Sequence, residues 1–455
     1  MPAGLELLPG TLDWSRYFFP YCTGLEALWF DLLALLVIGC FFDFKQPWRL
    51  RNLDLLMICC WVPLGDYEKG HLPLTVVLGY LPLFYFLPRL LHQVGRRAEE
   101  PCVVNYGPRW LTLLTALALL YGVGLALVAP YPYASWKGSD TLALSDSAVA
   151  GMLGANALRA GKIPYGNLPD HRDDYGPAYY YSYLPFMFLQ VKEGYFLHEY
   201  GAPARALAIV AHVAAILGFG LLGWRLRSAH YGLALAFAWA CLPYSLISLY
   251  WSQTGHLLTG ALLLWSCLAL SCSQLLGAAV LAWTSAAAFF PVFFIPAWAA
   301  TLRERKRAVF LGVVLGLGLA LWLPMLDQPD GLRKFFDSTV VYFQVQNRGE
   351  WSPWVQHPMT LPVKSFFSWM FLPFVAWVSW RARGRGFVSL MAITGAIVVF
   401  TQFFSLHAPG RYQLWMMPFL LPVLLLGTNR TRFEDGAVDS AEPEAGCIPP
   451  LTPET

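Results

Sequence analysis

Charged side chains are scarce in this chain. Asp, Glu, Lys and Arg make up 13% of its 455 residues and hydrophobic residues 57%, whereas about 25% of an average soluble domain is charged. The net charge of +3 comes without a basic cluster interleaved with aromatic residues, so we expect no nucleic-acid partner. The low charge predicts a protein that lies in the lipid bilayer.

Motifs for metal centres and nucleotide-driven pumps are also missing. The nine cysteines form no Cys-x-x-Cys pair and no Cys/His zinc spacing, which predicts free thiols and no metal site. The phosphate-binding loop Gly-x-x-x-x-Gly-Lys-Ser/Thr does not occur, which argues against a pump driven by nucleotide hydrolysis. A divalent metal is neither required nor excluded by the sequence, and we expect no cofactor.

Apolar segments of membrane-spanning length recur along the chain, separated by short basic or aromatic loops. They predict an all-α, polytopic membrane bundle over residues 1–428, followed by a disordered cytoplasmic tail at 429–455 that is rich in Glu, Pro and Ala. We predict thirteen transmembrane helices, at residues 25–43, 52–65, 72–91, 109–130, 203–224, 231–250, 256–272, 275–288, 289–302, 308–326, 361–380, 387–404 and 412–427.

Basic residues follow alternate apolar segments, which orients the bundle because cytoplasmic loops are rich in Lys and Arg. The clusters are Lys45, Arg49 and Arg51; Arg89, Arg96 and Arg97; Arg225 and Arg227; Arg303, Arg305, Lys306 and Arg307; Arg381, Arg383 and Arg385; and Arg430 and Arg432. A single helix over 275–302 would break this alternation, so we predict a break at Phe289, Phe290 and Pro291. The N-terminus is then outside and the C-terminus inside.

Two outer loops, 131–202 and 327–360, hold most of the polar residues that are not simply basic. In the first, the pattern after Ser145 and Asp146 predicts a short helix that ends at Gly161. A second apolar run, 179–191, follows the Gly176-Pro177 break and is too short to span. We expect both to be interfacial helices that hold Asp146 and the 173–175 turn near the mouth of a membrane cavity.

Motifs in these loops resemble glycosyltransferase family 87 of the GT-C superfamily. They are Asp146-Ser-Ala-Val-Ala-Gly-Met-Leu-Gly-Ala, Gly161-Lys-Ile-Pro-Tyr-Gly166, Asp174-Tyr-Gly-Pro177, Phe343-Gln-Val-Gln-Asn-Arg348 with Trp351-Ser-Pro-Trp354, and His407 with Tyr412, Trp415 and Pro418. The resemblance covers roughly residues 70 to 420 and implies a GT-C fold. It also implies that Asp146 is a general base and that a hexose, by resemblance mannose, comes from a polyprenyl-phosphate donor.

A sugar on a lipid phosphate already has a good leaving group, so one base and one cation suffice for transfer with inversion. Asp146 is the predicted base, and Arg348 is the preferred phosphate ligand because a guanidinium fork matches phosphate oxygens. The other predicted substrate-binding residues are Asp140, Asp173, Asp174, Tyr175, His256, Gln346, His407 and Arg411. The expected partners are membrane lipids, the donor, and a lipid or glycan acceptor at the outer face of a bacterial plasma membrane.

Each of these residues also has a structural interpretation. Asp146 could be a helix N-cap, Asp173 and Asp174 could hold a turn, and Arg348 could pair with Glu350. The tyrosines of 179–183 are most simply an aromatic belt at the membrane interface. A transporter or flippase for a lipid-linked or small polar substrate is the alternative function, because it too would place polar groups around a cavity.

Overall fold

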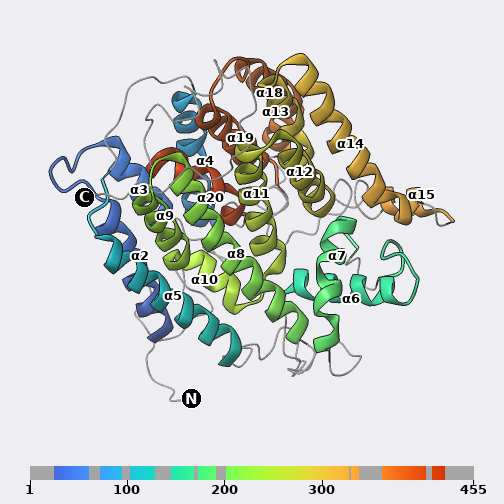
Figure 1. Ribbon diagram of the computed structural model, residues 1–455, viewed down its shortest axis with the longest axis horizontal. Helices are drawn as coiled ribbons and strands as arrows, with labels where there is room; N and C mark the ends of the chain where they lie inside the picture. Colours follow the sequence, from blue (N-terminus) through green and yellow to red (C-terminus); the bar gives the residue numbers. More distant parts are fainter. Residues whose placement is uncertain are drawn as a thin grey trace.

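The computed structural model describes residues 25–60, 72–94, 103–128, 145–168, 173–190, 201–326, 329–337, 361–405 and 412–425, and every regular element in these ranges is helical (Figure 1). The longer helices are α2 (Leu25–Phe41), α3 (Leu50–Cys60), α4 (Leu72–Gln93), α5 (Pro108–Val128), α6 (Asp146–Arg159), α8 (Ala202–Leu226), α9 (Ala229–Cys241), α11 (Thr254–Cys272), α12 (Gln274–Ala288), α14 (Glu304–Leu326), α18 (Leu361–Arg381) and α19 (Phe387–Thr401). The shorter ones are α7 (Pro177–Tyr183), η2 (Leu184–Leu189), α10 (Pro243–Tyr250), η4 (Phe290–Phe294), α13 (Ile295–Ala300), α15 (Gly331–Phe336), α20 (Gln413–Leu420) and η7 (Leu421–Leu425).

Four of the described helices are long and apolar enough to cross a bilayer, namely α5, α8, α11 and α14, and the bent pair α9–α10 can be counted as a fifth. The prediction of an all-helical membrane protein is confirmed. Each of the thirteen predicted segments overlaps a described helix or a broken pair of helices. Thirteen crossings and the GT-C arrangement stay predictions, because most of these helices are shorter or less apolar than a full span.

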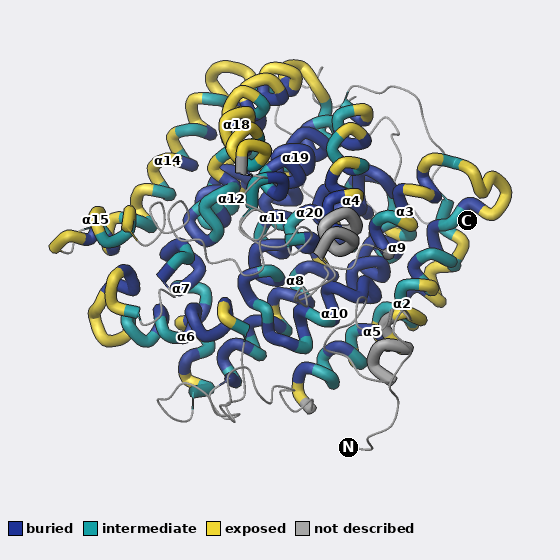
Figure 2. The backbone as a smooth tube through the Cα atoms, turned by 180° about the vertical axis from the view of Figure 1, so that it is seen from behind, coloured by how far each residue is buried: buried dark blue, intermediate teal, exposed yellow. Residues whose placement is uncertain are grey.

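The outer surface of the bundle is apolar, as a lipid-facing surface should be. On α14, Leu315, Leu319 and Leu323 recur every four residues and are all exposed, which places them on one face of the helix. Only 17% of the residues in the apolar stretch of α14 are buried, against 72% of those in the apolar stretch of α11. In Figure 2 α14 and α18 accordingly show exposed tube at the margin, whereas α19 and α20 are buried.

The centre of the bundle depends on close helix contacts at small residues. The hairpin of α8 and α9 is an example, since a Cβ on Gly232 would lie 2.9 Å from the backbone nitrogen of Trp224. Small residues at such crossings let two backbones approach, which is how helices pack in a membrane without a hydrophobic driving force between them. The buried Phe219 and Trp239 pack beside this crossing with ring centroids 5.3 Å apart.

The helix ends are held together by hydrogen bonds at one end of the bundle, which we call the basic end. Arg225 Nη2, near the end of α8, donates to Ser271 O of α11 at 2.6 Å. Asn105, before α5, donates to Gly39 O of α2 at 2.8 Å, and His230 Nε2 of α9 lies 2.8 Å from Tyr106 O. The basic end therefore collects the ends of α2, α8 and α11 and the starts of α5 and α9, as the alternation of basic clusters predicts.

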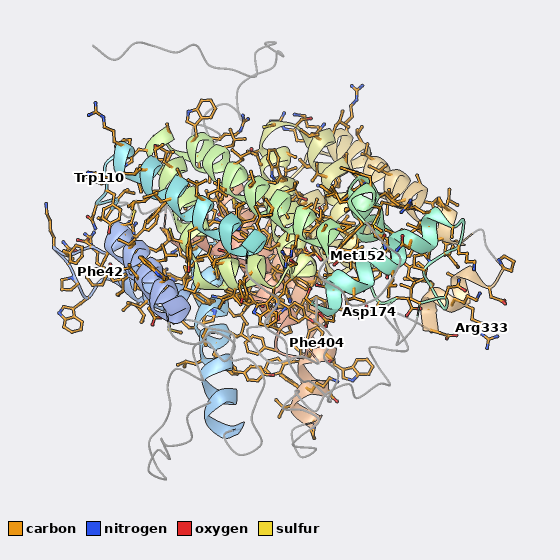
Figure 3. All side chains as sticks on the ribbon, turned by 90° about the horizontal axis from the view of Figure 1, so that it is seen from below. Phe42, Trp110, Met152, Asp174, Arg333 and Phe404 are labelled. Atoms are coloured by element: carbon orange, nitrogen blue, oxygen red, sulfur yellow. The ribbon has the colours of Figure 1, made fainter. Side chains whose placement is uncertain are left out.

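The opposite end, which we call the site end, carries α6 and α7. Gly176, before α7, donates its N–H to Ala287 O at the end of α12 at 3.2 Å, and Ser145, before α6, donates to Ser252 O, before α11, at 2.9 Å. Figure 3 labels Met152, Asp174 and Arg333 on one side of the molecule and Phe42 and Trp110 on the other.

Two helix breaks decide how this end is built. The predicted break after α12 is confirmed, because Phe289 has φ 57° and the 3₁₀ turn η4 follows it with Pro291 in its first turn. The predicted apolar segment 231–250 is broken rather than continuous, because α9 and α10 are bent by 54°. Leu242 adopts ψ 126°, the extended conformation that the following Pro243 imposes.

Candidate functional site

Helix α6 presents Asp146 at its first residue. The Ser145 side chain caps the helix by accepting the N–H of Ala148 at 3.2 Å, and Gly161 with φ 72° follows its end, so the predicted helix and both of its limits are confirmed. Since Ser145 is the cap, Asp146 does not fill that role. Asp146 is exposed, and its Oδ1 accepts the N–H of Ser147 at 2.8 Å.

The N-terminus of a helix is a favourable place for a carboxylate. The free N–H groups and the positive end of the helix dipole stabilise negative charge there. An ionised and exposed carboxylate is the form that a general base needs. The position of Asp146 is therefore suited to proton removal from a bound molecule.

Tyrosine rings of α7 fill the face of α6 where glycine occurs. A Cβ on Gly151 would lie 2.8 Å from Cδ2 of Tyr183, and a Cβ on Gly154 would lie 2.7 Å from Cγ of Tyr180. Tyr179, Tyr180 and Tyr183 are at most 1% exposed. The prediction of an aromatic belt at the membrane interface is wrong for these three, because their rings are buried inside the protein. Gly151 and Gly154, three residues apart, make room for the rings of Tyr183 and Tyr180.

A buried hydroxyl network joins α6 and α7 to the start of α11. Tyr179 OH donates to Ser147 O at 2.8 Å and lies 2.7 Å from Thr254 Oγ1, and Tyr183 OH forms a hydrogen bond with the same Thr254 hydroxyl. Thr254 is fully buried, where a hydroxyl must be hydrogen-bonded to avoid a large cost. The network fixes the start of α6 on the membrane bundle.

Tyr175 lies at the centre of the site end. Its ring stacks on Tyr179 with centroids 4.4 Å apart, and a Cβ on Gly255 would lie 3.3 Å from its Cε1. Burial, and then the nearby carboxylates of Asp146 and Asp174, raise the pKa of Tyr175 well above its ordinary value. The phenol therefore stays protonated at neutral pH and can donate a hydrogen bond, but it cannot act as a base.

His256, in the first turn of α11, is surrounded by aromatic rings. Its ring centroid lies 5.4 Å from that of Tyr412, 6.0 Å from that of Trp415 and 6.2 Å from that of Tyr244. Trp415 stacks on Phe290 with centroids 4.7 Å apart. A Cβ on the preceding Gly255 would lie 3.0 Å from Ser147 Cβ and 3.3 Å from Tyr175 Cε1, so the His256 group lies beside Tyr175 and the start of α6.

Asp173 has a structural position. It is 2% exposed, and its Oδ2 accepts the N–H of Gly166 at 2.6 Å, while Tyr165 OH donates to Tyr175 O at 2.9 Å. These bonds hold the 173–175 turn against the end of the α6 loop. The structure therefore supports the turn-holding interpretation of Asp173 over substrate binding. Asp174 is partly exposed, and its negative charge contributes to the raised pKa of Tyr175.

The start of the segment predicted as the second outer loop contacts the segment predicted as the first outer loop at an aromatic cluster. Tyr165 stacks on Trp322 of α14 at 6.0 Å and meets Phe335 of α15 edge-on at 5.4 Å. Phe289, at the break after α12, lies 5.7 Å from Trp322. Residues 329–337 are therefore held next to the loop after α6.

Backbone strain also concentrates here. Among the described residues, the non-glycine residues with positive φ are Ser252, Phe289 and Asp330. Ser252 bonds the α6 cap, Phe289 belongs to the aromatic cluster, and Asp330 precedes α15. Left-handed conformations at such residues cost about 1–3 kcal/mol and cluster at functional sites.

The structure thus brings four of the predicted residues together: Asp146, Asp174, Tyr175 and His256. Five others, Asp140, Gln346, Arg348, His407 and Arg411, lie outside the described residues. Sequence reasoning left Ser145 and Asp146 as alternative starts of the helix, and it missed Thr254 as the centre of the hydroxyl network. For Ser145 the cap preference of serine was a usable signal, whereas Thr254 gave none because its partners are 71 and 75 residues away.

The described part of the chain holds no group of three or more His, Cys, Asp or Glu side chains that could bind a metal. Comparison with protein-family models, with curated proteins and with solved structures finds no match for this chain.

Proposed function

We propose that this chain is a membrane-embedded, inverting glycosyltransferase of the GT-C type. It would move a hexose, by resemblance mannose, from a polyprenyl-phosphate donor to a lipid or glycan acceptor. The observation that carries the proposal is the position of Asp146, an exposed carboxylate at a helix N-terminus, next to Tyr175 and opposite the basic end. The resemblance of its flanking motif to family 87 supports the same role.

The reaction follows from one base. An acceptor hydroxyl attacks the anomeric carbon from the face opposite the phosphate, and its proton passes to the Asp146 carboxylate. The bond between the anomeric carbon and the phosphate oxygen breaks, and the electron pair leaves with the polyprenyl phosphate. Because the phosphate is a good leaving group, no second carboxylic acid has to protonate it, unlike in ordinary glycoside hydrolysis.

Other groups of the site end would orient the sugar. Tyr175 keeps its proton and can donate to a sugar hydroxyl, while the partly exposed Asp174 can accept from one. The rings around His256 offer flat apolar faces for the sugar or the first isoprene unit. The cation for the departing phosphate is assigned to Arg348, with Arg411 and His407 as further candidates, and all three lie outside the described residues.

The orientation in the membrane is part of the proposal. Since cytoplasmic loops are the basic ones, the basic end would face the cytoplasm and the site end the outer side, in a bacterial plasma membrane. One-sided labelling of a cysteine introduced at Lys162, which is exposed at the site end, tests this. Labelling of Lys162→Cys only from the cytoplasmic side would refute the mechanism, because the donor phosphate and the acceptor would meet on the wrong face.

Turnover by purified protein tests the function itself. Radiolabelled polyprenyl-phosphate hexoses are supplied with lipid and glycan acceptors, and the product anomer is determined. We expect transfer with inversion at the anomeric carbon. We also expect Arg348→Ala to lower the apparent affinity for the donor and the rate of transfer. If no donor is consumed but a labelled lipid crosses sealed proteoliposomes, the transporter or flippase alternative replaces the proposal.

A further inference from the structure

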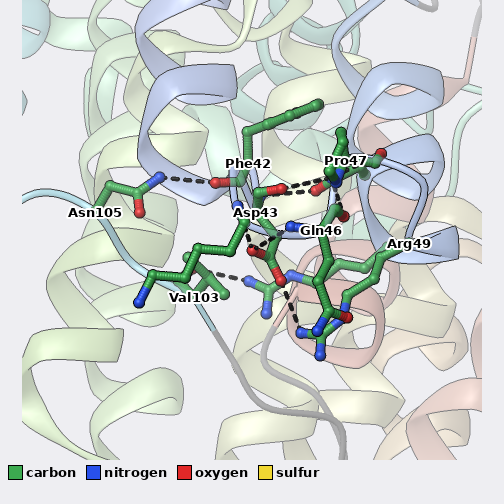
Figure 4. Close-up of polar contacts among 10 residues, drawn as sticks. Phe42, Asp43, Gln46, Pro47, Arg49, Val103 and Asn105 are labelled. Atoms are coloured by element: carbon green, nitrogen blue, oxygen red, sulfur yellow. Dashed lines mark hydrogen bonds and ion pairs between the residues drawn. The ribbon is translucent and has the colours of Figure 1, made fainter.

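The turn between α2 and α3 at the basic end is held rigidly by two side chains (Figure 4). The Asp43 carboxylate accepts the N–H groups of Lys45 and Gln46 at 3.1 and 3.2 Å and the guanidinium of Arg49 at 2.7 Å. Asn52 Nδ2 donates to the carbonyls of Asp43, Gln46 and Pro47 at 3.0–3.2 Å, and Asn52 Oδ1 accepts the N–H of Asp43 at 2.8 Å. The backbone of residues 43–49 is therefore preorganised.

This turn presents two large aromatic side chains outward. Trp48 is 97% exposed and Phe44 is 68% exposed. Lys45 is exposed beside them, and Arg49, which pairs with Asp43, keeps a third of its side chain exposed. Because the turn that carries Trp48 and Phe44 is already ordered, its binding to a surface would lose little further conformational entropy.

The same surface continues along the neighbouring helix. On α3, Leu50, Leu53 and Leu56 are all exposed, and a spacing of three residues places them along one side of the helix. This stripe begins two residues after Trp48 and runs away from the basic end. An exposed leucine stripe on a helix of a membrane protein faces lipid, so Trp48 lies where the lipid-facing surface ends.

We infer that the α2–α3 turn is an interfacial anchor that binds the headgroup layer of an anionic leaflet at the basic end. Trp48 and Phe44 lie at the boundary of headgroups and acyl chains, the depth that amphipathic aromatic rings prefer. Lys45 and the exposed part of Arg49 contact lipid phosphates, and no acidic side chain of the turn opposes them because Asp43 is buried against Arg49. The anchor fixes the depth of the α2–α3 hairpin and does not depend on the proposed function.

Hydroxyl-radical footprinting of the full-length protein in nanodiscs tests the anchor. The rate of Trp48 oxidation is measured by mass spectrometry between two references, the buried Trp239 and Trp298 of the same chain and an added tryptophan peptide. In nanodiscs of phosphatidylcholine with phosphatidylglycerol we expect Trp48 to react several-fold more slowly than the peptide. Oxidation at the rate of the peptide would overturn the inference and would point to a soluble partner as the occupant of this surface.

A charge variant tests the lipid preference. With phosphatidylcholine alone Trp48 should become more reactive, and Lys45→Gln should reduce the difference between the two lipid compositions. Lys306→Gln is a matched control, since Lys306 is an exposed lysine at the start of α14, and this substitution should leave the lipid dependence of Trp48 unchanged. A Trp48 rate that is equal in both lipids for the wild type would contradict the role of the headgroup charge.

Discussion

A methyl group added at Gly154 should loosen the contact that holds α6 on α7. In Gly154→Ala the new Cβ would lie 2.7 Å from Cγ of Tyr180 and closer still to two other ring carbons. Tyr180 is fully buried, and its ring is bounded by Tyr165 and Tyr179 at 6.3 and 6.0 Å. The ring therefore has no open space to move into, and one of the two helices has to shift.

The magnitude follows from two opposing effects. Overpacking of a well-filled core costs about 1–3 kcal/mol, and the upper part of this range applies because the ring is enclosed. Replacing glycine by alanine within a helix returns about 1 kcal/mol. The net destabilisation is then about 2 kcal/mol, which corresponds to a fall of several degrees in the thermal midpoint.

Thermal unfolding of the purified protein in detergent measures this, and activity loss should accompany it because Asp146 sits on α6. Gly316→Ala is the matched control: Gly316 lies within α14 with nothing within 4 Å, so the same substitution should leave the midpoint unchanged or raise it slightly. Tyr180→Leu in the Gly154→Ala background should relieve part of the clash. A Gly154→Ala protein as stable as the control would refute the packing argument.

Three further predictions concern single side chains. Ser145→Ala removes both the cap of α6 and the hydrogen bond to Ser252, so it should cost about 1 kcal/mol of stability and lower kcat more than it changes KM. Ser145→Thr should restore the stability and the kcat. Unchanged kinetics in Ser145→Ala would show that Ser145 does not position Asp146. Tyr175→Phe keeps the stacked ring but loses the hydroxyl, so KM for the donor or acceptor should rise. The pH dependence of the rate should stay the same up to pH 9, because the raised pKa of Tyr175 keeps its phenol protonated there. If Tyr175→Phe instead abolished a fall in rate at alkaline pH, this expectation would be contradicted. Arg89→Met removes the guanidinium that neutralises the buried Asp54 carboxylate at 2.7 Å, and it should cost about 3–5 kcal/mol of stability. The double variant Asp54→Leu with Arg89→Met should recover much of this stability. Equal thermal midpoints for the single and double variants would argue against the ion pair.

The apolar segments and their basic flanks predicted the helices well, because lipid exposure and burial both demand apolar residues over a helix length. The break at Phe289 was predicted from the alternation of basic clusters, since only a break placed the cluster around Arg303 on the same side as the other basic clusters. The bend at Pro243 was missed although the Leu242-Pro243 pair signals it. An apolar run of twenty residues satisfied the length of a span and hid the break within it.

The site was predicted in part. The start of α6 could be predicted from the cap and the apolar pattern, and this fixed the position of Asp146. The burial of Tyr179, Tyr180 and Tyr183 could not be read from those residues alone, because tyrosines at an interface and tyrosines packed on glycines have the same local sequence. Gly151 and Gly154, three residues apart, were the available signal.

Contacts between distant residues were beyond prediction from one sequence. Asp173 and Asp174 are adjacent and chemically alike, yet one is buried on Gly166 and the other is partly exposed beside Tyr175. Only the fold decides between them, since the deciding partner of Asp173 is the backbone of the loop after α6. The same holds for Thr254, whose partners come from α7.

Asp146 is proposed to remove the proton of the acceptor hydroxyl, and the turnover of Asp146→Asn measures this role. Asparagine keeps the size and the hydrogen bond to the Ser147 N–H but cannot take a proton. We predict a loss of about 10²–10⁴ in kcat with an unchanged thermal midpoint and retained donor binding, whereas Asp337→Asn, at an exposed position just after α15, should transfer sugar at the wild-type rate. A kcat for Asp146→Asn within about twofold of the wild type, far less than the loss of a general base produces, would contradict the claim.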